Sequence, residues 1–79
     1  MKNNIELKLL EIGFYFSGDV LRECRKKRHM KQKDVAKRLG THQQTISLHE
    51  RGVRLPSIEF LILYSTLYDV SLDKIVFGK

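Results

Sequence analysis

Residues 40–52 of this 79-residue chain read GTHQQTISLHERG, and this stretch decides the fold. Gly40 can take the positive φ with which a helix ends in a tight turn. The residues from about Gln43 to the stop at Gly52 then form a short predicted helix. Its first turn carries two neighbouring amides, Gln43 and Gln44, so the leading face of this helix presents hydrogen-bond donors and acceptors.

Positive charge is concentrated around this helix rather than spread along the chain. The sequence holds 15 lysines and arginines against nine acidic residues, a net charge of +6. Eleven of the basic residues and only three of the acidic ones lie between Arg22 and Arg54, whereas the flanks are slightly acidic. Basic side chains that neutralise phosphates drive non-specific binding to nucleic acids. The local excess predicts a polyanionic partner, although residues 25–28 alone would indicate only a solvated basic helix.

Length and composition bound the class of protein. A chain of 79 residues makes one domain with a small core, a size at which oligomerisation often supplements stability, and we expect a dimer. The single cysteine, Cys24, allows no internal disulfide, and no leader-like segment precedes the domain. The longest apolar stretch, residues 60–64, is far shorter than the roughly 20 residues that span a bilayer. We therefore expect a soluble cytoplasmic protein without a membrane partner.

Serines, glycines and the spacing of apolar residues divide residues 17–77 into five short helices. Ser17, Ser57 and Ser71 are predicted caps at the start of the first, fourth and fifth helices. The predicted helices begin at residues 18 or 19, 32, 43, 58 and 72, and end near residues 28, 39, 51, 68 and 77. The fourth is expected to turn these side chains inward: Ile58, Leu61, Tyr64, Ser65 and Tyr68. The prediction is an all-α fold.

The joint between the second and third helices is the most specific feature of the sequence. Two helices that meet near a right angle across a short turn need small and apolar residues at fixed positions. Val35, Leu39 and Ile46 supply the positions that face inward. Ala36 is small where the two helices approach, and Gly40 stands at the turn. These positions predict a helix-turn-helix over about residues 32–51.

The arrangement resembles the helix-turn-helix of phage repressors and Cro, the Xre family, from about Ser17 to Phe77. Gln32 at the start of the second helix and the Glu50-Arg51-Gly52 ending of the third add to this resemblance. It implies a compact five-helix, lambda-repressor-like DNA-binding domain. His49 departs from the pattern, because its position is usually apolar, and we expect a partly buried imidazole there.

The resemblance also implies roles for individual residues. Base edges in the major groove would be read from the third helix by Gln43, Gln44, Ser47 and Leu48. Phosphate contacts and support would come from Gln32, Thr41, Arg51 and Arg54, while Arg25 and Glu50 would tie the first helix to the end of the third. Independently of the family, a carboxamide can pair with both N6 and N7 of adenine. Leu48 either contacts a thymine methyl group or is a tolerated exposed leucine.

Metal and catalytic chemistry find no support in the sequence. His29, His42, His49 and Cys24 do not have the short paired spacing of zinc ligands. Cys24 stands at an inward helix position that suits a small apolar residue. No nucleophile with a base and an orienting partner can be assembled, and no glycine loop could cradle a phosphate group. We expect no metal, no cofactor and no enzyme activity.

Two apolar regions exceed what a five-helix domain requires. Phe60, Leu63 and Leu67 lie outside the predicted inward stripe of the fourth helix and are candidates for a dimer surface. The N-terminal extension, residues 1–16, is also apolar from Ile5 to Phe16, and its periodicity fits either a short helix or a strand. The extension either covers the fourth helix within one chain or forms the subunit contact with it.

These features predict a sequence-specific regulator of transcription that binds double-stranded DNA, with repression as its output. A homodimer would place two copies of the third helix in successive major grooves of a palindromic operator, with half-sites about 10 base pairs apart or a multiple of this. Three alternatives stay open: an antitoxin that holds a toxin on the apolar surplus, a protein-interaction adaptor that reads no DNA, and an RNA binder that uses the basic run.

Overall fold

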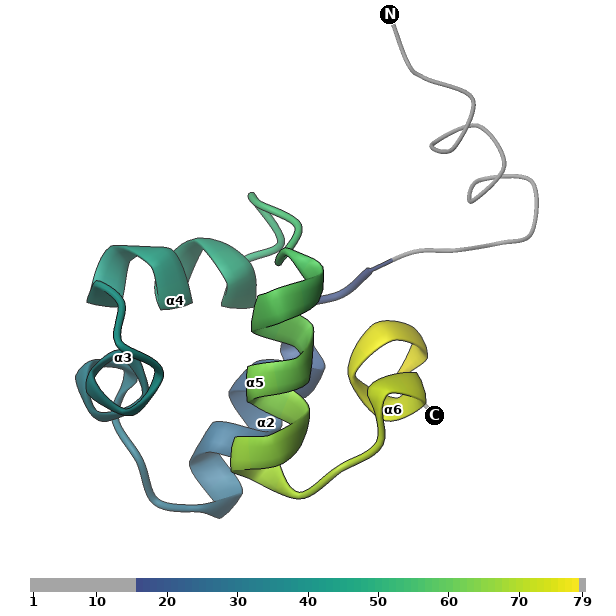
Figure 1. Cartoon of the computed structure of the whole chain (residues 1–79), viewed down its shortest axis with the longest axis horizontal. Coiled ribbons are helices and arrows are strands. Elements are labelled where there is room, and N and C mark those ends of the chain that lie inside the picture. Colours follow the sequence, from purple (N-terminus) through teal and green to yellow (C-terminus); the bar gives the residue numbers. More distant parts are fainter. Residues whose placement is uncertain (1–15, 79) are drawn as a thin grey trace, which may run out of the picture.

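The computed structural model describes residues 16–78, and its helices follow the predicted order (Figure 1). α2 spans Asp19–Lys27, α3 Gln32–Leu39, α4 Gln43–Glu50, α5 Ile58–Tyr68 and α6 Leu72–Phe77. Residues 16–78 contain no strand. The predicted all-α class and its five helices are confirmed. The helix or strand predicted for the N-terminal extension lies outside the described residues, except for Phe16, which packs against the core.

The other three helices pack on two sides of a central pair, α2 and α5. Figure 1 shows α5 in front of α2. The helices α3 and α4 lie on one side of this pair, and α6 lies on the other side. α3 is seen end-on while α4 lies in the plane of the view, so the two axes cross steeply, as in a helix-turn-helix. No helix within the described part of the chain is long and apolar enough to cross a membrane.

The core takes at least one apolar side chain from every helix. Its buried members are Leu21, Val35, Ala36, Ile46, Tyr64, Tyr68 and Ile75. The inward positions predicted for the joint are therefore confirmed, with Leu39 partly buried against the same cluster. Each helix contributes only one or two buried residues to this core. These short helices are therefore stabilised by packing against one another rather than by the intrinsic stability of any single helix.

Local hydrogen bonds fix where these helices begin and end. Ser57 Oγ accepts a hydrogen bond from Phe60 N at 3.3 Å and Ser71 Oγ one from Lys74 N at 3.0 Å, as expected of N-caps. Gly40 closes α3 with a φ of +70°, and the next residue, Thr41, donates its N–H to Ala36 O at 2.9 Å. This left-handed residue turns the chain from α3 directly into α4.

The faces of α5 differ from the sequence prediction. Ile58, predicted as a core residue, is 64% exposed, so that prediction is wrong. Phe60 and Leu67, predicted to face away from the core, pack partly buried against it, and of the three surplus residues only Leu63 is exposed. α5 is apolar almost all round, so its periodicity could not select the buried face. The contact with the end of α4 determines which face of α5 is buried, because the His49 ring packs edge to face against Phe60 with ring centroids 4.9 Å apart.

Candidate nucleic-acid interface

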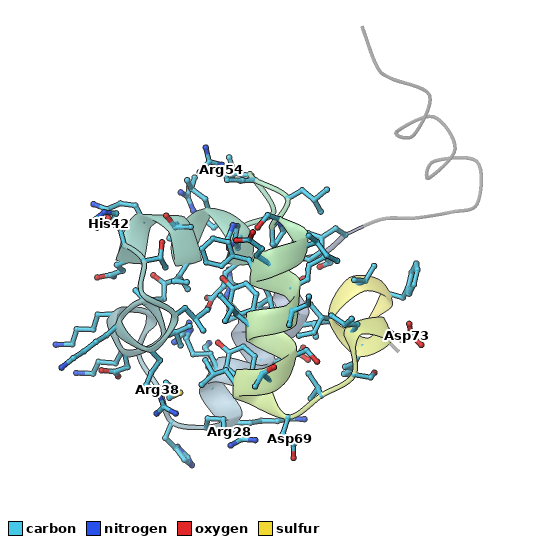
Figure 2. All side chains as sticks on the ribbon, in the orientation of Figure 1. Arg28, Arg38, His42, Arg54, Asp69 and Asp73 are labelled. Atoms are coloured by element: carbon cyan, nitrogen blue, oxygen red, sulfur yellow. The ribbon has the colours of Figure 1, made fainter. Side chains whose placement is uncertain are left out.

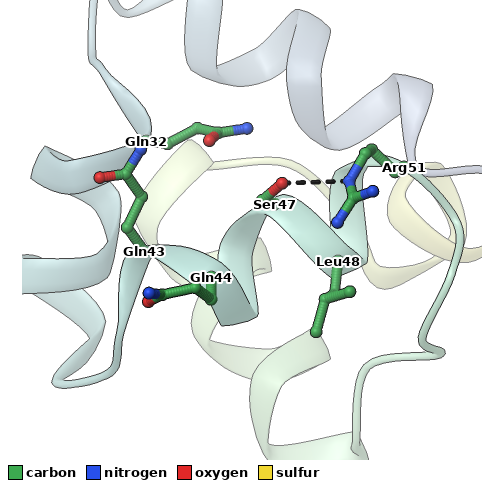
Figure 3. Close-up of a pocket in the computed structure, with 6 residues that line it drawn as sticks. All are labelled: Gln32, Gln43, Gln44, Ser47, Leu48 and Arg51. Atoms are coloured by element: carbon green, nitrogen blue, oxygen red, sulfur yellow. Dashed lines mark hydrogen bonds between the residues drawn. The ribbon is translucent and has the colours of Figure 1, made fainter.

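The outer face of α4 and the start of α3 together line a hollow of about 510 Å³ (Figure 3). Its lining residues are Gln32, Gln43, Gln44, Ser47, Leu48 and Arg51. All six are residues to which the sequence assigned a contact with DNA or its support. Five of them lie on α4 or at its end with the spacing of one helix face, since residues three and four apart are neighbours on a helix.

The chemistry of this hollow suits the edges of bases. Gln43 and Gln44 are exposed at the start of α4, and each offers one acceptor and two donors. Ser47 and Leu48 stand one turn further along and are partly buried. Leu48 adds an apolar wall, and no acidic side chain is among the lining residues. An aliphatic group beside amides and a hydroxyl matches the mixture of methyl groups, donors and acceptors in a major groove.

Arg51 belongs to the same surface. Its Nε donates a hydrogen bond to Ser47 Oγ at 3.1 Å, and Figure 3 shows the guanidinium group turned back along α4 toward this serine. The sequence assigned Arg51 only to phosphate contacts. Its position over the outer face of α4 was not predicted, because the sequence pattern does not determine the side-chain rotamer of an arginine just beyond a helix end.

The inner end of α4 is anchored by the buried carboxylate of Glu50. Arg25 Nε donates to Glu50 Oε2 at 2.8 Å and Arg25 Nη2 donates to Oε1 at 3.0 Å. The Glu50 side chain is fully buried and that of Arg25 is 13% exposed. The hydrogen bonds to Glu50 raise the pKa of Arg25, against the opposing effect of burial. The structure thus contains the pair that the family resemblance implied for these two positions.

The same carboxylate reaches the hollow through Gln32. Gln32 Nε2 donates to Glu50 Oε1 at 3.1 Å, so one amide that lines the hollow is held from behind by a buried charge. A carboxylate accepts hydrogen bonds only, which fixes the Gln32 amide with its NH₂ group inward. The sequence suggested that Gln32 supports the base-reading amides, but not that Glu50 is its partner.

His49 fixes the inner face of α4 to α5. Its side chain is buried, and its Nδ1 is hydrogen bonded to Tyr64 Oη at 2.8 Å. The imidazole also meets the Phe60 ring edge to face. Burial lowers the pKa of His49, and the positive charge of Arg54 lowers it further. The predicted inward imidazole is confirmed, and its hydrogen bond to Tyr64 satisfies a polar group that an apolar residue at this position would leave unpaired.

The remaining predicted contact residues flank the hollow without lining it. Thr41 is partly buried in the turn before α4, and Arg54 is exposed in the loop that follows α4. Figure 2 shows Arg54 and His42 near the two ends of α4, whereas Arg28 and Asp69 lie at the far end of α2 and α5. Arg54 therefore places a positive charge near the C-terminal end of α4.

Metal ligands are not gathered anywhere in residues 16–78. No group of three or more His, Cys, Asp or Glu side chains there has the arrangement of a metal site. Cys24 is partly buried and packs against the core, the position that its helix periodicity predicted.

Comparison with known proteins defines the class. The family model described as Helix-turn-helix matches residues 21–75, and the chain therefore belongs to the helix-turn-helix family, in its phage-repressor and Cro-like form. The P22 c2 repressor, solved in complex with a synthetic operator, has a TM-score of 0.75 and 31% sequence identity to this chain. That similarity covers 78% of this chain and 94% of the repressor chain. The resemblance inferred from the sequence is confirmed.

Two regulators of Bacillus subtilis (strain 168) are also similar in sequence. The HTH-type transcriptional regulator YqaE is 36% identical over 59 residues, which cover 75% of this chain and 51% of YqaE. The HTH-type transcriptional regulator ImmR is 37% identical over 62 residues, which cover 78% of this chain and 48% of ImmR. The chain thus spans about half the length of these relatives.

Proposed function

We propose that this chain is a transcriptional regulator of the repressor type that reads double-stranded DNA with α4 in the major groove. The hollow on the outer face of α4 carries this proposal, because two amides, a hydroxyl and an aliphatic group on α4 meet a third amide from the start of α3, and α4 ends beside exposed basic residues. The relation to the P22 c2 repressor, which binds an operator, supports it. Occlusion of a promoter by the bound protein is the proposed means of repression.

Gln43 and Gln44 are the proposed principal base readers. Both are exposed in the first turn of α4, and a glutamine amide can bind N6 and N7 of one adenine at once. Ser47 adds a hydroxyl that can donate or accept. We assign to Leu48 a contact with a thymine methyl group, because it forms part of the wall of the hollow together with these polar residues.

Thr41 and Arg54 are the proposed phosphate contacts, with Gln32 in support. Such contacts fix the position of α4 on the duplex but do not depend on sequence. The basic excess between Arg22 and Arg54 supplies attraction to DNA over a longer range.

A symmetric dimer is the proposed active form, and the structure suggests a different contact surface from the one the sequence favoured. Val53, Leu55, Ile58 and Ile62 are from 50 to 66% exposed and lie on the loop after α4 and the first half of α5. Ile58 and Ile62 share one face of α5 because they are four residues apart. A contact made by this loop surface would join the two copies beside the C-terminal ends of their α4 helices, an arrangement compatible with half-sites about one helical turn apart.

Leu63 lies on another part of the surface. It lines a shallow groove of about 260 Å³ with Arg38, Leu39, Thr66 and Leu67. Among the apolar residues of this groove, Leu39 and Leu67 are partly buried against the core and only Leu63 is exposed, so the groove has less exposed apolar surface than the loop region. We therefore prefer the loop surface for the dimer.

The test is selection of binding sites from random duplexes at near-physiological salt. A recovered palindrome with half-sites about 10 base pairs apart is the expected result. Gln44→Ala should lose preference at one base position in each half-site, at a cost of roughly 1–3 kcal/mol. Arg54→Ala should weaken binding to all sequences alike. Binding that is salt-sensitive but blind to sequence would overturn the proposal.

A further inference from the structure

Arg51 has the position of a base reader rather than that of a phosphate contact. It lines the same hollow as Gln44, Ser47 and Leu48, and its Nε donates to Ser47 Oγ at 3.1 Å (Figure 3). Among residues 16–78, the terminal Nη1 and Nη2 atoms have no hydrogen-bond partner. The side chain is therefore anchored at Nε and presents its two Nη atoms to the hollow.

The direction of this side chain is the decisive observation. Arg51 caps the C-terminus of α4 and has helical φ and ψ, so its side chain leans toward the preceding turn. The hydrogen bond to Ser47 Oγ fixes the guanidinium group over that turn. One turn of helix rises about 5.4 Å, so this fold returns the charge to the level of the polar residues in the middle of α4.

We propose that Arg51 reads a guanine in the major groove, with Ser47 as its positioning residue. The inference rests on the proposed function. Guanine presents two acceptors there, N7 and O6, and the paired N–H groups of a guanidinium match them with two parallel hydrogen bonds. Because Nε is occupied by Ser47, the end of the guanidinium, Nη1 with Nη2, makes this contact.

The spacing of Gln44 and Arg51 along α4 also fixes the place of the guanine in the half-site. Gln44 and Arg51 are seven residues apart, which is about 10 Å along a helix, and successive base pairs are about 3.4 Å apart. The guanine should therefore lie within about three base pairs of the adenine that Gln44 reads. It should be on the side of the half-site that faces the end of α4.

The experiment uses the full chain and the duplex recovered by site selection. Replacing the selected guanine by 7-deazaguanine removes the N7 acceptor and leaves the Watson–Crick pairing intact. The wild-type chain should bind the modified duplex about tenfold more weakly, within the range of a lost bidentate contact. Arg51→Ala should bind the two duplexes equally, because the side chain that senses N7 is gone.

Arg54→Ala is the matched control, since it removes the same charge from the neighbouring loop. It should weaken binding to both duplexes equally and so retain the full effect of 7-deazaguanine. Ser47→Ala should reduce that effect while the thermal midpoint of unfolding stays unchanged. Arg51 is exposed, so the same midpoint should show that Arg51→Ala is folded.

Two results would overturn the inference and leave the proposed function intact. One is a selected palindrome without a guanine near the adenine read by Gln44. The other is a wild-type chain that selects a palindrome but is insensitive to 7-deazaguanine, with Arg51→Ala weaker on every sequence alike. Failure to select any sequence would instead overturn the proposed function, and the inference with it.

Discussion

Arg25 and Glu50 form a bidentate ion pair that joins the last turn of α2 to the last residue of α4. Its two hydrogen bonds measure 2.8 and 3.0 Å, and Arg25 Nη1 also donates to Met30 O at 3.0 Å. One guanidinium therefore holds the end of α4 and the connection between α2 and α3. Because Gln32 is bonded to the same carboxylate, the pair also controls the back of the hollow.

Arg25→Ala should lower the free energy of unfolding by about 3–5 kcal/mol, because it leaves a buried carboxylate without its cation. Urea denaturation at pH 7 measures this loss. The matched control is Arg22→Ala, since Arg22 lies 4.0 Å from the same carboxylate but is 42% exposed. An exposed partner of this kind contributes about 1 kcal/mol or less. Equal losses for both variants would contradict the assignment.

Gly18, the N-cap residue of α2, lies directly against the end of α4. A Cβ atom at this position would collide with the carbonyl oxygens of His49 and Glu50. Gly18→Ala should therefore separate the two helix ends and cost about 1–3 kcal/mol, the range of overpacking in a core. Thermal unfolding measures the effect, and Lys26→Ala on the exposed side of α2 should change stability by no more than about 0.5 kcal/mol. A Gly18→Ala variant as stable as the wild-type chain would disprove the steric argument.

The features predicted correctly from the sequence depend on neighbouring residues. Ser57 and Ser71 cap helices whose first turns follow them at once, and Gly40 ends α3 by its own backbone freedom. The six residues of the hollow were grouped through the family resemblance, and helix periodicity agrees with it because it places most of them on one face. Signals of this kind need no knowledge of the rest of the fold.

The features that sequence reasoning missed depend on contacts between distant residues. Gly18 was interpreted only as a possible helix start, but it is needed because the end of α4 lies against it. The buried face of α5 was assigned wrongly at Ile58 and Phe60, because an almost wholly apolar helix has no preferred face until its neighbours are known. The hydrogen bond from Gln32 to Glu50 joins residues that are 18 positions apart, and no local pattern in the sequence predicts that these two side chains meet.

Ile58→Glu should abolish dimer formation if the loop surface is the subunit contact. A charge in the centre of an apolar contact must be desolvated without a partner, which costs several kcal/mol. Sedimentation equilibrium over a range of concentrations measures the result. Leu63→Glu provides the control, because Leu63 lies in the separate groove beside Arg38. If Leu63→Glu dissociates the dimer and Ile58→Glu does not, the groove is the contact and the loop surface is not.

Gln32→Met should weaken the preference for adenine without unfolding the domain. Methionine has a similar length but cannot donate to Glu50, so the bond that orients this side of the hollow is lost. The expected loss is about 1.5–3 kcal/mol at most, the contribution of a hydrogen bond to a charged group. Competition between duplexes with and without the selected adenine measures it. Lys33→Met, at the next exposed position, should lower affinity for both duplexes alike, and an unchanged preference in Gln32→Met would refute the role of this bond.

The stability of the domain should fall as the pH drops below about 6.5 because of His49. Burial beside Tyr64 and the charge of Arg54 lower the pKa of His49 in the folded chain below its ordinary value of 6.5. As the pH falls, His49 is therefore protonated in the unfolded chain before it is protonated in the folded chain. Protonation then favours unfolding, and the loss of stability grows from about pH 6.5 down to the pKa of His49 in the folded chain. Above the pKa of His49 in the unfolded chain, the imidazole is neutral in both states and this loss of stability is absent.

Urea midpoints between pH 7 and pH 5 measure this dependence on His49. The double variant His49→Phe with Tyr64→Phe removes the titrating ring and its hydroxyl partner together, so no buried polar group is left unpaired. Its midpoint should fall less with pH than that of the wild-type chain, whatever its absolute stability. His42→Asn, at the exposed position before α4, should retain the wild-type slope. A double variant with the same slope as the wild-type chain would show that groups other than His49 govern the loss of stability at low pH.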